Sequence, residues 1–107
     1  GKDRFRFEVM PEDDPEQKVA NDLVLAEAER FGIPVIATTD SHYISKSEYN
    51  SHEVMLAIQT KKTMDDPDRM SFGKAQCHLR TTQEMLESFP KNHEAVWETG
   101  RIADRCD

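Results

Sequence analysis

Apolar and polar residues alternate at the start of the chain and then change to a helical spacing. Residues 5–10 alternate, which predicts a half-buried strand. Residues 14–17 supply an N-cap, a first-turn proline and a capping-box partner for a helix that Gly32 closes. The apolar face expected for this helix is Ala20, Leu23, Val24, Ala28 and Phe31. Residues 33–39 are apolar and β-branched, which is typical of a parallel strand buried on both faces. The sequence therefore predicts a βαβ unit.

The second half of the chain contains further helices around a polar loop. A capping box at residues 45–48 predicts a helix that extends to about Thr60. Residues 61–74 are rich in turn-forming residues and lack apolar periodicity, which indicates an extended connection over the surface. After a short strand expected at residues 77–80, a third capping box at residues 81–84 opens the first of two closing helices.

Net charge, the length of apolar runs and cysteine spacing narrow the possible functions of the chain. Fourteen Lys and Arg residues against 21 Asp and Glu residues give a formal charge of -7, which argues against independent binding to nucleic-acid phosphates. No run approaches the roughly 18 to 20 apolar residues of a membrane span. Cys77 and Cys106 lie far apart and form no CxxC pair, so we expect a reducing cytoplasm and two small buried hydrophobic side chains. The abrupt start suggests a piece of a longer protein.

The sharpest local chemistry lies directly after the second predicted strand. Asp40 and His42 are separated by one residue, and an extended backbone would point both side chains to the same side. Their oxygen and nitrogen donors could then share one metal ion, and this mixture suits zinc, manganese or iron. The alternative is that Asp40 caps the following turn and His42 is an ordinary hydrogen-bonded loop residue.

The surrounding sequence favours the metal interpretation. Residues 31–43, FGIPVIATTDSHY, resemble the last metal-binding motif of PHP (polymerase and histidinol phosphatase) domains in bacterial-type DNA polymerase III alpha subunits. The resemblance continues upstream in residues 5–9 and 15–19, and downstream in residues 51–60. The tail, residues 79–106, resembles the segment that joins the PHP domain to the palm region, so the likeness covers essentially the whole chain in one order.

This resemblance implies an α/β fold: a partial, distorted β/α (TIM-like) barrel of PHP type with a helical C-terminal extension toward the polymerase core. Residues 1–60 would belong to the barrel, and residues 61–107 would form a surface loop and connector. Asp40 and His42 would be the final pair of metal ligands in a site for phosphoester hydrolysis, including 3′-5′ exonuclease action. The remaining ligands would lie on earlier strands that this chain lacks.

The incomplete ligand set has consequences for the chain and its partners. We expect weak metal binding and no catalytic residue within these 107 residues alone. The resemblance implies a parent DNA-directed DNA polymerase that uses magnesium, acting in the cytoplasm. Its partners would be the remainder of the alpha subunit, DNA through that subunit, and other replisome subunits, with no membrane.

Other residues leave alternatives open. His52 could orient a metal ligand from the following helix, although such a histidine more often satisfies a hydrogen bond in the core. Cys77-His78 stands where the family often has an aromatic pair, and Lys61 stands where glycine is common. Two competing functions are an acidic replisome-interaction module with a vestigial metal site, and a phosphoesterase that completes its site by oligomerising.

Overall fold

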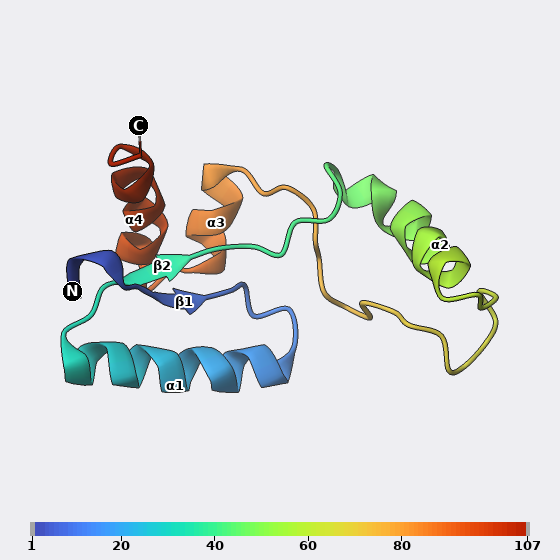
Figure 1. Cartoon of the computed structure of the whole chain (residues 1–107), viewed down its shortest axis with the longest axis horizontal. Coiled ribbons are helices and arrows are strands. Elements are labelled where there is room, and N and C mark those ends of the chain that lie inside the picture. Colours follow the sequence, from blue (N-terminus) through green and yellow to red (C-terminus); the bar gives the residue numbers. More distant parts are fainter. Residues whose placement is uncertain (1, 107) are drawn as a thin grey trace. The chain divides into compact units, whose positions relative to one another are not determined.

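The computed structural model describes residues 2–106 and divides into two compact units. The first unit combines residues 1–39 with residues 80–107, and the second is residues 40–79. The elements in chain order (Figure 1) are the 3-10 helix η1 (Lys2–Arg4), β1 (Phe7–Val9), α1 (Pro15–Phe31), β2 (Val35–Ala37), the 3-10 helix η2 (Lys46–Glu48), α2 (Tyr49–Gln59), α3 (Thr82–Ser88) and α4 (His93–Ala103). The mixture of helices with a parallel strand pair confirms the α/β class.

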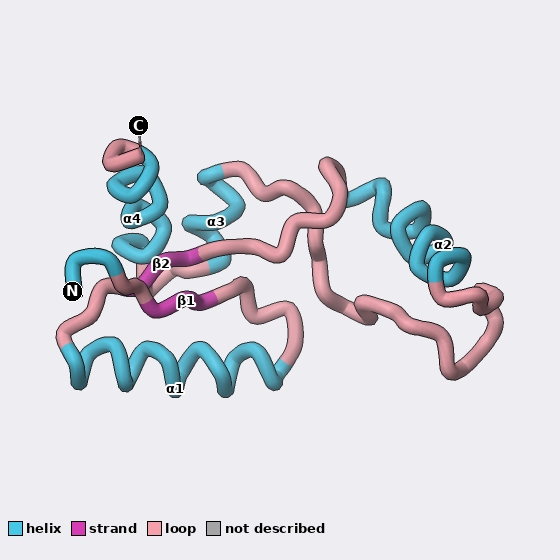
Figure 2. Tube along the Cα trace, in the orientation of Figure 1, coloured by secondary structure: helices cyan, strands magenta, loops and turns pink. Residues whose placement is uncertain are grey.

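The predicted βαβ unit is present in the first compact unit. β1 and β2 pair in parallel, with Phe7 opposite Val35. Figure 2 shows α1 as the helix that connects the two strands. The Asp14 side chain accepts the Gln17 backbone N–H at 2.8 Å, which satisfies one of the unpaired donors at the start of α1. Gly32 ends the helix in the left-handed region at φ 61°, where the absence of a Cβ removes the steric penalty.

The apolar core of the first unit lies around the two strands. It consists of Val9, Ala37, Phe89, Ala95 and Val96, with partly buried side chains from α1 and α3 packed against it. Figure 1 shows α1 and α4 on opposite sides of the strand pair. Burial of apolar surface is therefore the main stabilising contribution in this unit.

The buried face predicted for α1 is partly wrong. Leu23 and Phe31 are 65% and 48% exposed, whereas the polar Asn21 is buried. The Asn21 side chain donates to the Met10 carbonyl at 2.7 Å and accepts the Met10 N–H at 3.2 Å. Because these bonds satisfy the backbone just beyond β1, the helix turns Asn21 and Ala28 inward and leaves Leu23 outside.

A buried ion pair also stabilises the first unit. The Glu98 carboxylate accepts hydrogen bonds from Arg6 Nε and Arg101 Nε, each at 2.6 Å. Hydrogen bonds from Arg101 and Arg6 lower the pKa of Glu98, against the opposing effect of burial. The charged form of this carboxylate therefore joins α4 to the segment before β1.

The second unit consists of η2, α2 and a long loop. The loop predicted at residues 61–74 contains no helix or strand among the residues that the structure describes. The strand predicted at residues 77–80 is reduced to a single parallel bridge between Tyr43 and His78. A strand needs a continuous ladder of pairs, and only one bridge forms here, so that prediction is wrong in extent.

The chain just beyond helix α2 adopts an unusual backbone conformation at Lys61. Lys61 has φ 57°, the same left-handed region that Gly32 adopts after α1. The Lys61 and Lys62 N–H groups donate to the Ile58 and Ala57 carbonyls at 3.1 and 2.8 Å, which satisfies the end of the helix. The Lys61 side chain thus occupies a position at which glycine is preferred.

Candidate metal centre

Asp40 and His42 lie close together in the loop that follows β2. His42 Nδ1 is 2.8 Å from the Asp40 backbone carbonyl oxygen and 3.7 Å from Asp40 Oδ1. A carbonyl oxygen can only accept, so Nδ1 is the donor in this contact. The side chains are 37% exposed for His42 and 69% exposed for Asp40. Both side chains are therefore accessible to a metal ion from solvent.

Cys77 joins this pair from the far end of the long loop. One donor atom of Cys77, one of Asp40 and one of His42 all lie within 4.8 Å of one another. The His42 N–H donates to the Cys77 carbonyl at 2.7 Å, which fixes the two segments side by side. Sequence reasoning correctly predicted a buried Cys77, but the buried Cys106 that it also predicted is wrong, because Cys106 is exposed. It missed the proximity of Cys77 to Asp40 and His42, because the two segments are distant in sequence. The available signal was Cys77-His78, which departs from the aromatic pair that the resemblance leads one to expect.

His52 lies beside His42 without a hydrogen bond between the rings. The two ring centroids are 5.4 Å apart, and His52 also stacks near Tyr43 and Phe72 at 5.2 and 4.8 Å. Within residues 2–106, His52 Nδ1 is buried and has no hydrogen-bond partner. Packing of this kind can restrict the rotation of His42. An orienting role for His52 stays a prediction.

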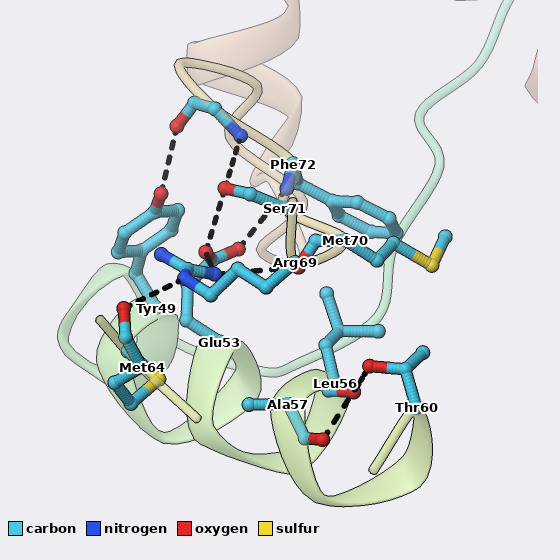
Figure 3. A network of polar contacts seen from close by, with 11 residues as sticks. Tyr49, Glu53, Leu56, Ala57, Thr60, Met64, Arg69, Met70, Ser71 and Phe72 are labelled. Atoms are coloured by element: carbon cyan, nitrogen blue, oxygen red, sulfur yellow. Dashed lines mark hydrogen bonds and ion pairs between the residues drawn. The ribbon is translucent and has the colours of Figure 1, made fainter. Parts of the chain in front are cut away.

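A buried carboxylate organises the loop next to these residues. Glu53 is 1% exposed and accepts hydrogen bonds from Arg69 Nη1 at 2.6 Å, Ser71 Oγ at 2.7 Å and the Phe72 N–H at 3.1 Å (Figure 3). Burial raises the pKa of Glu53, but hydrogen bonds from Ser71, Arg69 and Phe72, with the Arg69 charge, together lower it below its ordinary value. Glu53 is therefore held in its charged form.

This carboxylate network has a direct consequence for the candidate ligands. Glu53 holds the Phe72 backbone, and the Phe72 ring packs against the His42 ring with centroids 4.8 Å apart. Tyr49 Oη donates to the Gly73 carbonyl at 2.8 Å and ties the same turn to α2. Sequence reasoning did not identify Glu53, because a single Glu in a helix carries no local signal of burial.

The donor set indicates which ions the centre can hold. A carboxylate oxygen, an imidazole nitrogen and a thiol sulfur are ligands that zinc accepts together, whereas calcium and magnesium prefer oxygen alone. Three donors leave a fourth position of a tetrahedral zinc site for another group. The residues present therefore fit a divalent transition-metal ion, while the geometry leaves its identity open.

Two further features lie outside this centre. A hollow of about 630 Å³ in the first unit is lined by parts of β2 and α4 and contains neither Asp40 nor His42. Among the described residues, no helix combines the length and apolar character needed to cross a membrane.

Comparison with known proteins finds relatives of this chain among DNA polymerase III alpha subunits. No protein-family model matches the sequence. DNA polymerase III subunit alpha of Thermus aquaticus is 39% identical over 98% of the chain, that of Treponema pallidum is 35% identical over 100%, and that of Escherichia coli K12 is 34% identical over 98%. The chain spans 9% of the length of each of these relatives. Over nearly its whole length the chain is therefore similar to one segment of DNA polymerase III alpha subunits.

Proposed function

We propose that this segment supplies Asp40 and His42 to the divalent-metal site of a PHP domain within a replicative DNA polymerase. The single observation that carries the proposal is the convergence of the two side chains directly after β2. The similarity to alpha subunits over nearly the whole chain supports it. Magnesium-dependent DNA polymerisation would belong to the parent subunit, of which this segment is a small part.

The fold supports the barrel part of this proposal. A parallel βαβ unit is the repeating element of a β/α barrel, and functional side chains in such barrels follow the carboxyl ends of the strands. Asp40 and His42 follow β2 in the sequence. In this proposal residues 1–60 contribute to the barrel and residues 61–107 lead toward the polymerase core.

The proposed chemistry is metal-dependent phosphoester hydrolysis of the 3′-5′ exonuclease type. A divalent ion bound there supplies a polarising charge for a phosphoryl oxygen and lowers the pKa of a coordinated water. The protein's own residues hold and orient: the Asp40 carbonyl fixes the His42 ring, and the Asp40 carboxylate offers a charged oxygen. Zinc, manganese and iron are all candidates for the ion, and the remaining ligands would come from outside this chain.

The proposal also defines partners and location. The segment would act with the remainder of the alpha subunit, reach DNA through that subunit, and work beside other replisome subunits in the cytoplasm. The formal charge of -7 supports the indirect route to DNA, because phosphate binding depends on cationic side chains.

The test uses the alpha subunit that contains this segment. Asp40→Ala and His42→Ala should lower bound metal and manganese- or zinc-supported 3′-5′ exonuclease activity by at least about tenfold, since weaker perturbations of metal sites already have effects of that size. Magnesium-dependent primer extension should stay within about twofold, because the polymerase site is separate.

A matched control is Asp65→Ala, which removes a carboxylate from the surface loop without touching the centre. Normal metal content and exonuclease activity in both ligand variants would overturn the proposal. A wild-type subunit that contains no metal would instead favour a scaffold function for this domain.

A further inference from the structure

We propose that Cys77 is a third ligand of the Asp40 and His42 centre and makes it selective for thiophilic ions such as zinc and cobalt over manganese and magnesium. This inference rests on the proposed metal site and adds to it a ligand and a class of ion. The first support is positional: one donor atom from each of the three side chains lies within 4.8 Å of the other two.

The position of Cys77 is fixed by its backbone. The His42 and Tyr43 N–H groups both donate to the Cys77 carbonyl, at 2.7 and 3.3 Å, and the Cys77 N–H donates to Tyr43 Oη at 3.1 Å. Both backbone polar groups of Cys77 are thus held by the segment that carries the candidate ligands. Backbone hydrogen bonds within the second unit therefore keep the Cys77 sulfur close to Asp40 and His42.

Burial and donor chemistry supply the second support. Cys77 is 6% exposed, while the Asp40 and His42 side chains reach solvent, so a sulfur would lie at the base of the centre and the other two donors at its open side. His42 Nδ1 lies 2.8 Å from the Asp40 carbonyl oxygen, and a hydrogen bond of this kind commonly fixes a metal-binding imidazole.

The binding step has a simple balance. Cys77 Sγ–H loses its proton to water and the resulting thiolate donates an electron pair to the ion, with no change in oxidation state. Thiolate ligands favour zinc and cobalt, whereas manganese and magnesium favour oxygen ligands. A sulfur in the set therefore raises the ratio of zinc to manganese affinity.

The experiment is a Co²⁺ titration of the reduced 107-residue chain, read from the near-ultraviolet thiolate-to-cobalt charge-transfer band. The band should appear in the wild-type chain and in Cys106→Ser, which removes an exposed thiol on the other compact unit. It should be absent in Cys77→Ser and in His42→Ala. Zinc affinity should fall at least about tenfold in Cys77→Ser, while manganese affinity stays within about twofold.

A second measurement needs no substitution at the centre. Zinc should slow alkylation of Cys77 in the wild-type chain by about tenfold and leave Cys106 unchanged, because a metal-bound thiolate is a poor nucleophile. Circular dichroism of Cys77→Ser, with its helices unchanged, establishes that the variant folds.

The outcomes separate this inference from the proposed function. Cobalt binding without a thiolate band, lost in Asp40→Ala, overturns the role of Cys77 and leaves the Asp40 and His42 pair standing. Absence of any cobalt binding, or persistence of the band in Cys77→Ser, also overturns it. The exonuclease test in the alpha subunit is independent of all three results.

Discussion

Each of the two compact units of this chain is stabilised internally by a different kind of interaction. Residues 1–39 and 80–107 share an apolar core around the strand pair, whereas the centre of residues 40–79 is the buried Glu53 carboxylate. An apolar core stabilises by excluding water and is not directional. A buried carboxylate stabilises only when several donors point at it in the correct geometry.

The candidate metal-binding residues lie in the unit whose centre is a polar hydrogen-bond network. Asp40, His42 and Cys77 all belong to residues 40–79. The loop lacks apolar periodicity, so the Glu53 network supplies the order that the proposed metal ligands would require. We infer that the first unit provides a stable framework and the second provides a precisely arranged loop.

The largest expected effect comes from removing the Glu53 carboxylate. Glu53→Ala should lower the free energy for opening residues 61–74 by about 3 kcal/mol, since it leaves Arg69 partly buried without its anion. Amide hydrogen exchange of Phe72, whose N–H donates to Glu53, should accelerate by roughly a hundredfold.

The matched control for this substitution is Glu94→Ala in α4. Glu94 forms an exposed ion pair with Arg101, and such pairs contribute at most about 1 kcal/mol. Unchanged exchange at Phe72 in Glu53→Ala would show that the loop is ordered by something other than this carboxylate.

Local signals in the sequence were sufficient to predict the first unit. The Asp14 cap, the Gly32 terminus and the β-branched second strand each specify a local conformation, and the structure confirms the resulting βαβ unit. The inner face of α1 was mispredicted because Asn21 is buried by hydrogen bonds to Met10. Apolar periodicity cannot register a polar residue that satisfies distant backbone groups.

The candidate centre was only partly predictable. The spacing of Asp40 and His42 pointed to a shared site, and their proximity appears in the structure. The place of Cys77 beside the pair and the buried Glu53 network were not predicted, since their partners come from remote segments and no local pattern encodes such contacts. Contacts between loop segments depend on the tertiary fold, which a single sequence does not specify residue by residue.

A smaller effect should follow from acid. The folded pKa of Glu53 lies below its ordinary value of 4.5, so the carboxylate stabilises the loop above that pH and the stabilisation is lost as pH falls through the folded value. The loss should be smaller than in Glu53→Ala, because a protonated carboxyl can still accept from Ser71. NMR titration of the Glu53 carboxyl carbon should give a midpoint below 4.5.

The control for the acid effect is Glu53→Gln, which keeps the shape but cannot titrate. The pH dependence of the Phe72 amide signal should disappear in this variant. The Glu98 carboxylate of the first unit, whose pKa is also lowered, should titrate unchanged in it. A midpoint for Glu53 above 4.5 would mean that burial outweighs its hydrogen bonds.

The smallest effect compares the two helix ends. Gly32 follows α1 and Lys61 lies two residues after α2, both with left-handed backbone, but only the lysine carries a Cβ. Lys61→Gly should stabilise residues 40–79 by about 0.5 kcal/mol, because relief of a strain of roughly 1 to 2 kcal/mol exceeds the added entropy of unfolded glycine. Lys62→Gly should destabilise instead. Among the described non-glycine residues only Lys61 has a positive φ, so glycine at position 62 relieves no strain and only adds entropy to the unfolded chain. Amide exchange at the end of α2 measures both, and a destabilising Lys61→Gly would show that the lysine side chain contributes more than its backbone strain removes.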